Sequence, residues 1–168
     1  MIESKVTELK QWNTFKLDDK GNYEVYRGID RNYYSKWIGF RLIDEGKIFE
    51  EVDKAVVDFY LTYYYYQLKL DLIEDELLEF VILDFATQNG KRKTIEKLER
   101  VCGLEVTGKP TTKLMTYMHQ HKGFLFPYII LEFLEFYYYT EKLLQGGFLL
   151  KAYRQLVKHK ANHKSDSQ

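Results

Sequence analysis

The chain has little cysteine and little proline: Cys102 is the only thiol, and two prolines occur among 168 residues. A single thiol excludes an internal disulfide and a zinc site built from cysteines, so a disulfide-stabilised secreted domain is not expected. The amino-terminal segment lacks the apolar centre of a signal peptide, and no uncharged apolar run is long enough to span a bilayer. We therefore expect neither a signal peptide nor a membrane span.

Net charge is also absent, because Lys+Arg and Asp+Glu each number 25. That balance argues against broad electrostatic binding to nucleic acid or to an anionic membrane. His159 and His163 have the four-residue spacing of helical metal ligands, but they lie in a polar stretch without a third ligand. Glycine patterns of nucleotide-binding loops do not occur. We expect no metal and no cofactor.

Aromatic residues, in contrast, are abundant: 15 tyrosines and 11 phenylalanines. Side chains of this kind bury large areas, either in a core or in an interface. A thick aromatic core is the favoured interpretation, although Tyr63–Tyr66 and Tyr137–Tyr139 could face a partner and form a homo- or hetero-oligomer. The length predicts one domain over residues 1–160 with a flexible tail at 161–168.

Apolar residues recur at three- and four-residue steps through most of the chain, which predicts an all-α fold. Turn-forming residues such as Asp18 and Gly21 interrupt this pattern and predict a loop or small hairpin near residues 16–29. Asp30 is expected to cap the first of several short helices within 30–46. The other expected helices cover residues 3–13, 49–70, 74–88, 92–102, 111–119, 125–144 and 148–158.

Several helix boundaries are marked by individual residues. Asn89-Gly90 suits a left-handed helix stop, and Thr111 or Thr112 can cap the helix that follows. Pro127 is expected in the first turn of its helix, where a missing N–H is tolerated. Gly146-Gly147 should end that helix.

The stretch from Asp84 to Leu114 carries a resemblance to a known family. It contains D-F-A-T-Q-N-G, then Leu98-Glu99, then T-G-K-P-T-T-K-L. This order resembles the D-x-A-x-N-x-G, L-Q and D-G-x-x-G-P-x-T-L segments of glycoside hydrolase family 108, the lysozyme-like muramidases of phages and bacteria. Gln88 stands where that family has asparagine.

Further motifs extend the resemblance in order along the chain. Asp19–Asn22 resembles a D-x-G-G turn, and Tyr26–Ile29 resembles Y-K-G-I. Tyr33–Phe40 resembles a segment with W-x-G-W, and Phe148–Tyr153 resembles F-L-x-G-W. The resemblance implies a lysozyme-like fold that acts on peptidoglycan.

The catalytic acid of that family is absent from its expected place. A muramidase needs a protonated carboxylic acid, and the family's glutamate lies in an E-G-G-Y motif. Counting back from Gly28 places it near Lys10 or Gln11, neither of which can act as an ordinary proton donor there. Glu8 and Glu24 are the substitute catalytic candidates, although each is more simply a solvated surface residue.

The front of the chain also holds the candidate substrate-binding residues. Aromatic rings can stack on sugars, and a carboxylate in the D-x-G-G-like turn could contact them. These candidates are Trp12, Asp19, Tyr26 and Trp37.

Three functions remain open. The favoured one is a phage or prophage protein that has lost catalysis and serves as a structural component of the virion or its assembly. The second is an active N-acetylmuramidase, and the third is a peptidoglycan-binding module without catalysis. The expected partners are accordingly peptidoglycan or other virion proteins, and the expected location is the virion or the bacterial cytoplasm.

Overall fold

The computed structural model describes residues 2–139, and for 138 and 139 it describes the backbone only. The expected helix at 148–158, its neighbours Gly146-Gly147 and the tail at 161–168 lie outside the described residues. The chain divides into two compact units, Met1–Leu68 and Lys69–Gln168. The expectation of one domain stays a prediction, because compact units of this size also occur as parts of a single domain.

The first unit contains most of the short elements. Its helical elements are α1 (Ile2–Val6), the 3-10 helix η1 (Lys10–Asn13), α2 (Ile38–Asp44), α3 (Phe49–Tyr60) and the π-helix η2 (Leu61–Tyr65). The prediction of one helix over 3–13 is wrong. The chain leaves the helix at Leu9, whose backbone is extended (ψ 142°) and whose side chain is buried.

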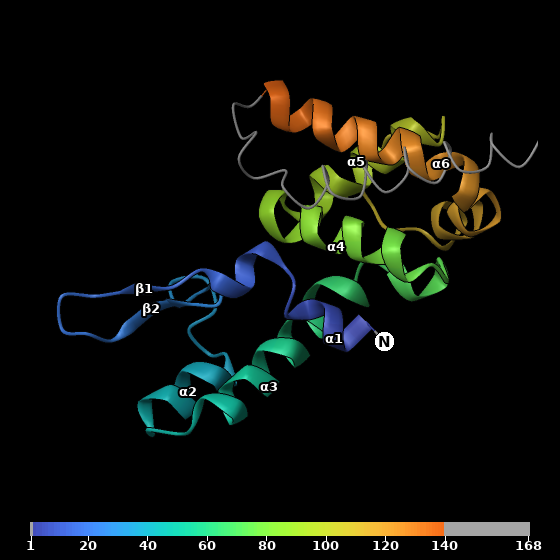
Figure 1. Cartoon of the computed structure of the whole chain (residues 1–168). Coiled ribbons are helices and arrows are strands. Elements are labelled where there is room, and N and C mark those ends of the chain that lie inside the picture. Colours follow the sequence, from blue (N-terminus) through green and yellow to red (C-terminus); the bar gives the residue numbers. More distant parts are fainter. Residues whose placement is uncertain (1, 140–168) are drawn as a thin grey trace, which may run out of the picture. The chain divides into compact units, whose positions relative to one another are not determined.

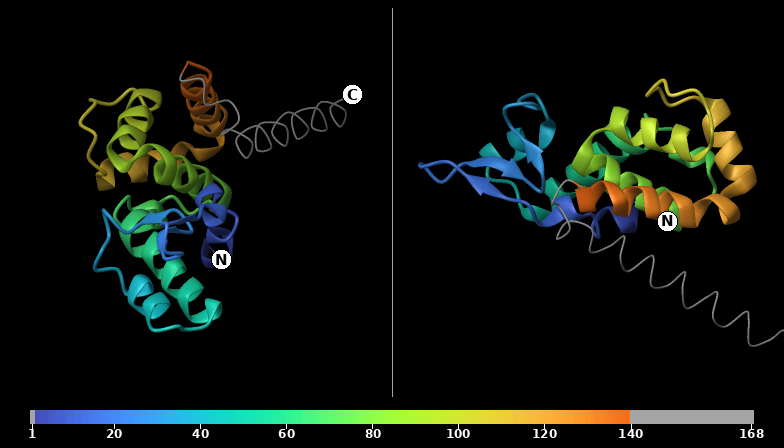
Figure 2. Two further views of the ribbon diagram at one scale, coloured as in Figure 1. Left: turned by 90° about the vertical axis from the view of Figure 1, so that its left-hand side faces the viewer. Right: turned by 90° about the horizontal axis from the view of Figure 1, so that it is seen from above.

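A three-stranded antiparallel sheet occupies the region predicted as a loop or hairpin. Its strands β1 (Lys16–Leu17), β2 (Tyr23–Tyr26) and β3 (Ile29–Asp30) pair in sequence order. The turn end of the β1–β2 hairpin extends away from the helices of this unit (Figures 1 and 2). The hairpin prediction is confirmed, but the fold is mainly α rather than all-α, because these residues form a real sheet.

The connection from β3 to α2 differs from the expectation. Asp30 does not cap a helix: it ends β3, and its Oδ1 accepts a hydrogen bond from the Asn32 N–H at 2.8 Å. Such an aspartate turn competes with helix formation. The helix begins only at Ile38, after the extended residue Trp37.

The second unit is helical throughout its described part. After the 3-10 turn η3 (Leu70–Leu72) come α4 (Glu76–Asn89), α5 (Lys91–Val101) and α6 (Thr112–Tyr139). Every residue of α4 from 78 to 86 is buried, so this helix is the centre of the unit. Of the helices within residues 2–139, none is both long and apolar enough to cross a membrane.

Two predicted boundaries in this unit are confirmed. Gly90 has φ +88° and separates α4 from α5, as the Asn89-Gly90 pair predicts. Thr111 caps α6, because its Oγ1 accepts a hydrogen bond from the Leu114 N–H at 3.2 Å.

Helix α6 is longer than expected, since the two helices predicted at 111–119 and from 125 onward are one. Leu114, Met118, Leu125 and Ile129 are all buried and share one face, so burial of that face carries the helix across the gap. Pro127 therefore lies in the helix interior and not in a first turn. The ribbon changes direction within α6 between its gold and orange parts (Figure 1), as an interior proline causes.

The tyrosine run at 63–66 is divided between core and surface, and of the run at 137–139 the structure describes only the Tyr137 side chain. Tyr65 and Tyr137 are buried, whereas Tyr63 and Tyr66 are 36% and 53% exposed. Cys102 is buried, as expected for a core thiol, and burial raises its pKa to about 11. Only part of the 63–66 run is therefore accessible to a partner.

Candidate functional site

The Y-x-G-I motif forms the turn between β2 and β3. Tyr26 pairs with Ile29, so Arg27 and Gly28 are a two-residue loop. Their φ angles are +45° and +79°, the pair of positive values that a type I′ hairpin turn requires. Arg27 adopts a backbone conformation that is unusual for a large side chain, so contacts elsewhere must hold it there.

Glycine is required at position 28 because other side chains pack closely against it, as well as because of its positive φ angle. A Cβ on this residue would lie 2.7 Å from the Cβ of Gln11 and 2.8 Å from the hydroxyl of Tyr60. That hydroxyl donates a hydrogen bond to the carbonyl of Arg27 at 2.7 Å. Of the two positions at which the resemblance places the family's glutamate, Gln11 is thus the one that lies against the Y-x-G-I turn.

The Arg27 side chain forms an ion pair with Asp53 of α3. The guanidinium donates from Nε to Oδ1 at 2.5 Å and from Nη2 to Oδ2 at 2.8 Å. Tyr26 donates its hydroxyl to the same Oδ1 at 2.9 Å. Arg27 also stacks over Trp12, 4.2 Å from the ring centroid, and donates to the Trp12 carbonyl at 3.0 Å. We call these four residues the Arg27–Asp53 cluster.

Proton positions in the cluster follow from burial and charge. Burial, assisted by the hydrogen bond to Asp53, raises the pKa of Tyr26 to about 12. Burial disfavours the charged form of Arg27, but the hydrogen bonds and negative charge of Asp53 favour it more strongly, so the pKa of the guanidinium is raised. The Asp53 carboxylate accepts all three hydrogen bonds, so the cluster is a satisfied structural network.

Glu8 does not lie in an environment suited to a general acid. It belongs to the turn that follows α1, its side chain is 52% exposed, and its carboxylate lies 3.7 Å from Lys5 Nζ. The catalytic acid of a muramidase lies in an apolar pocket, and an exposed side chain beside a lysine has no such surroundings.

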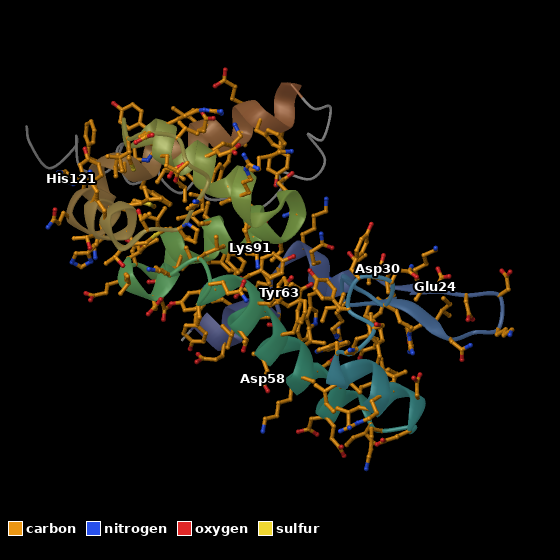
Figure 3. All side chains as sticks on the ribbon, turned by 180° about the vertical axis from the view of Figure 1, so that it is seen from behind. Glu24, Asp30, Asp58, Tyr63, Lys91 and His121 are labelled. Atoms are coloured by element: carbon orange, nitrogen blue, oxygen red, sulfur yellow. The ribbon has the colours of Figure 1, made fainter. Side chains whose placement is uncertain are left out.

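Glu24 lies on β2 and pairs with Lys16 of β1. Its hydrogen bond and charge raise the pKa of that lysine, and Asp30 adds to the effect. Figure 3 shows Glu24 and Asp30 on the same hairpin. A solvent-accessible carboxylate paired with a lysine lacks the apolar pocket in which a muramidase holds its catalytic acid.

The substrate-binding candidates lie in three places. Trp12 and Tyr26 meet in the Arg27–Asp53 cluster. Asp19 is exposed in the β1–β2 turn, where Asp18 and not Asp19 organises the backbone by accepting from the N–H groups of residues 20 and 22. Trp37 lies at the start of α2, in an aromatic group of its own.

Asp53 is the residue that sequence reasoning missed. It is separated from Arg27 by 26 residues and lies on a helix whose other acidic residues, such as Glu50 and Glu51, are exposed. No local motif marks it, because its partner comes from another element. Among the described residues, no three histidine, cysteine or carboxylate side chains gather into a metal-binding group.

The D-x-A block of the second unit proves to be a packing element. Asp84 is buried, and Gln88 donates its Nε2 to the Asp84 carboxylate at 2.8 Å. Asn89 donates to the hydroxyl of Tyr137 at 3.0 Å, which links α4 to α6. Asn89 therefore joins two helices, whereas the Gln88–Asp84 hydrogen bond lies within α4.

Glu99 has a similar structural role. Its carboxylate accepts hydrogen bonds from the N–H groups of Thr107 and Gly108 at 2.7 and 2.8 Å, and from the Thr107 hydroxyl at 2.6 Å. Burial opposes the charge, but these donors outweigh it and lower the pKa of Glu99. Glu99 thus holds the Gly-Pro turn against α5, which is a structural role.

Comparison with known proteins gives one family. The glycosyl hydrolase 108 family model matches residues 12–90. Over this segment, which is just under half of the chain, the sequence is similar to the glycosyl hydrolase 108 family. No curated protein and no solved structure matches the chain at the threshold applied.

The glycosyl hydrolase 108 segment includes the hairpin, the Y-x-G-I turn, Asp53 and the D-x-A motif up to Gly90. It begins at Trp12, immediately after Gln11. The motifs of residues 98–114 and 148–153 lie outside the match, so their resemblance to the family stays a prediction. A family of this kind indicates a peptidoglycan-hydrolase type of protein.

Proposed function

We propose that this protein no longer hydrolyses glycan and serves as a structural component of a phage virion or its assembly. One observation carries the proposal: Gln11 lies against the Y-x-G-I turn, at the place where the resemblance puts the catalytic glutamate. Glutamine cannot protonate a leaving oxygen, and a glycosidic bond is not broken at useful rates without that proton.

The carboxylate of the Arg27–Asp53 cluster does not replace the missing acid. Asp53 accepts two hydrogen bonds from Arg27 and one from Tyr26. These bonds occupy both carboxylate oxygens and pair them with the Arg27 charge. The network therefore stabilises the turn and opposes acid catalysis.

Exposed aromatic side chains support a role in assembly. Tyr63 and Tyr66 come from the π-helix and the residue that follows it, and both are accessible. Tyrosine is enriched at protein interfaces because it combines a large apolar ring with a polar tip. A protein that has lost catalysis can still be retained for such contacts.

The assembly role is tested by mass spectrometry of purified virions from a host that encodes the protein. We expect the protein at a reproducible copy number relative to the major capsid protein, and retained after washing at high salt. Absence from washed virions, with the protein present in the infected-cell lysate, would contradict the assignment.

The alternative is an active muramidase that uses Glu8. Similarity to the family favours it, whereas the exposed position of Glu8 beside Lys5 does not. The Glu8→Gln variant separates the two. Clearing of purified sacculi by the wild-type protein that is lost in Glu8→Gln would establish the alternative and overturn the structural proposal.

A further inference from the structure

Helix α6 carries an apolar stripe that the rest of the described chain leaves exposed. Phe124, Tyr128 and Leu131 recur at steps of four and three residues, so they share one side of the helix. Their exposed fractions are 66%, 50% and 49%. The rings of Phe124 and Tyr128 lie 5.1 Å apart between centroids, so the stripe is continuous. Large apolar side chains grouped in this way indicate a surface that binds another segment.

The stripe borders a groove of about 490 Å³. Helices α5 and α6, labelled in Figure 1, supply all of its lining residues. Val101 and Leu125 add apolar surface to the stripe, while Glu132 and Glu135 contribute carboxylates. Glu132 pairs with Lys97 at 2.6 Å, and Glu135 is exposed. The groove is therefore mainly apolar, with acidic side chains in its lining.

Residues 148–158, which the sequence predicts as a helix, have a composition that fits this groove. The apolar residues of the segment fall on one side of such a helix: Phe148, Leu149, Ala152, Tyr153, Leu156 and Val157. The charged residues of the segment are all basic: Lys151, Arg154 and Lys158. An apolar helix face fits an apolar groove, and charges of opposite sign favour the approach of the two surfaces.

The length of the intervening chain permits this contact. Between Tyr128 and Tyr139, the last described residue, α6 rises by about 17 Å. Residues 140–147 can span up to about 26 Å, and connections of this length join antiparallel helices in bundles. Gly146-Gly147 lie just before the segment and allow the chain to reverse. A helix over 148–158 is itself about 17 Å long, so it can run back along α6 as far as the stripe.

We propose that residues 148–158 form a helix that packs antiparallel to α6 in the groove of the same chain, with its apolar side on Phe124, Tyr128 and Leu131. A helix this short is at best marginally stable in water, so it depends on burial of its apolar side. The same contact covers the stripe and closes it to other partner proteins. The inference does not depend on whether the protein hydrolyses glycan or is part of a virion.

Hydrogen exchange of the full chain at two protein concentrations, followed by mass spectrometry, tests the proposal. In the wild-type protein we expect the amides of residues 148–158 to be protected, equally at both concentrations. Tyr128→Asp places a charge in the contact and should reduce this protection by more than about tenfold, because burial of a large apolar side chain contributes at least that factor. Thr116→Asp, at an exposed position of α6 outside the groove, is the matched control and should leave the protection unchanged.

Two further variants separate the possible occupants of the groove. Leu131→Asp in the stripe and Leu156→Asp in the segment should each reduce the protection as Tyr128→Asp does. The amides of α4 should stay protected in all of them, which shows that the unit remains folded. No protection of the segment in the wild-type protein would overturn the proposal, as would a loss in Leu156→Asp that neither stripe variant reproduces. Protection that rises with protein concentration would also overturn it, because the groove would then hold the segment of a second copy.

Discussion

Replacing Asp53 by asparagine removes the carboxylate that holds the Y-x-G-I turn. The asparagine amide keeps one acceptor oxygen, but its NH₂ group faces a donor of Arg27, so at least one of three hydrogen bonds is lost. Arg27 then keeps its positive charge without a counter-ion. Its side chain is only 16% exposed, and that of Asp53 is 26% exposed.

The magnitude follows from this partial burial. Breaking a fully buried ion pair costs about 3–5 kcal/mol, and an exposed pair contributes about 0–1 kcal/mol. For Asp53→Asn we expect a loss of about 2–3 kcal/mol in the free energy of unfolding, since water can partly reach Arg27.

A matched control exists in the same unit. Asp44 accepts two hydrogen bonds from Arg31, both at 2.9 Å, but its side chain is 55% exposed. Asp44 also ends helix α2, where a negative charge is not favoured by the helix dipole. Asp44→Asn should therefore cost less than about 1 kcal/mol.

Urea unfolding followed by tryptophan fluorescence measures both variants. Trp12 and Trp37 are the only tryptophans and both lie in the first unit, so the signal reports on the unit that contains the substitutions. A loss in Asp53→Asn no larger than that in Asp44→Asn would refute the argument that burial makes the Arg27–Asp53 pair the stronger one.

Three further results are expected. Gly28→Ala should cost at least about 2 kcal/mol in unfolding experiments, because the new Cβ meets Gln11 at a left-handed position; a neutral result would contradict the close contact. Tyr26 keeps its proton to about pH 12, whereas an unfolded tyrosine ionises near pH 10, so stability should fall as pH rises above 10 and fall less steeply in Tyr26→Phe. The pKa of Glu99 is lowered in the folded protein, so its ionised carboxylate stabilises the fold at pH values above the ordinary pKa of a glutamate, and this stabilisation is lost as the pH falls. In thermal melts, Glu99→Gln should therefore reduce the loss of stability at acid pH, and an unchanged pH dependence would count against the assignment.

The sequence predicts those features that depend on neighbouring residues. Turn formers between residues 16 and 29 indicate the hairpin, and Gly90 and Thr111 mark helix boundaries, because each acts on backbone groups a few positions away. The helices α4 and α5 follow from apolar periodicity in the same way. Features of this kind can be predicted from the sequence alone, because the interacting residues are close together in it.

Features that depend on tertiary contacts are not predicted. Pro127 indicates a helix start, yet burial of one continuous face carries α6 through it. Asp53 has no sequence signal because its partner lies in a distant turn. Glu8 is a plausible acid by its position in the chain, but only the structure shows it exposed beside Lys5. The resemblance identifies the place of the missing glutamate, and the structure shows Gln11 against the turn there.

The most direct test of the central claim is the release of reducing ends from purified sacculi. The full-length wild-type protein is incubated between pH 4 and 8 with sacculi from Gram-negative and Gram-positive bacteria, and an active muramidase serves as the positive control. Because Gln11 cannot donate a proton and Asp53 is held by Arg27, we predict no release above the buffer blank at any pH. Release that rises with protein concentration and disappears in Glu8→Gln or Glu24→Gln would contradict the account.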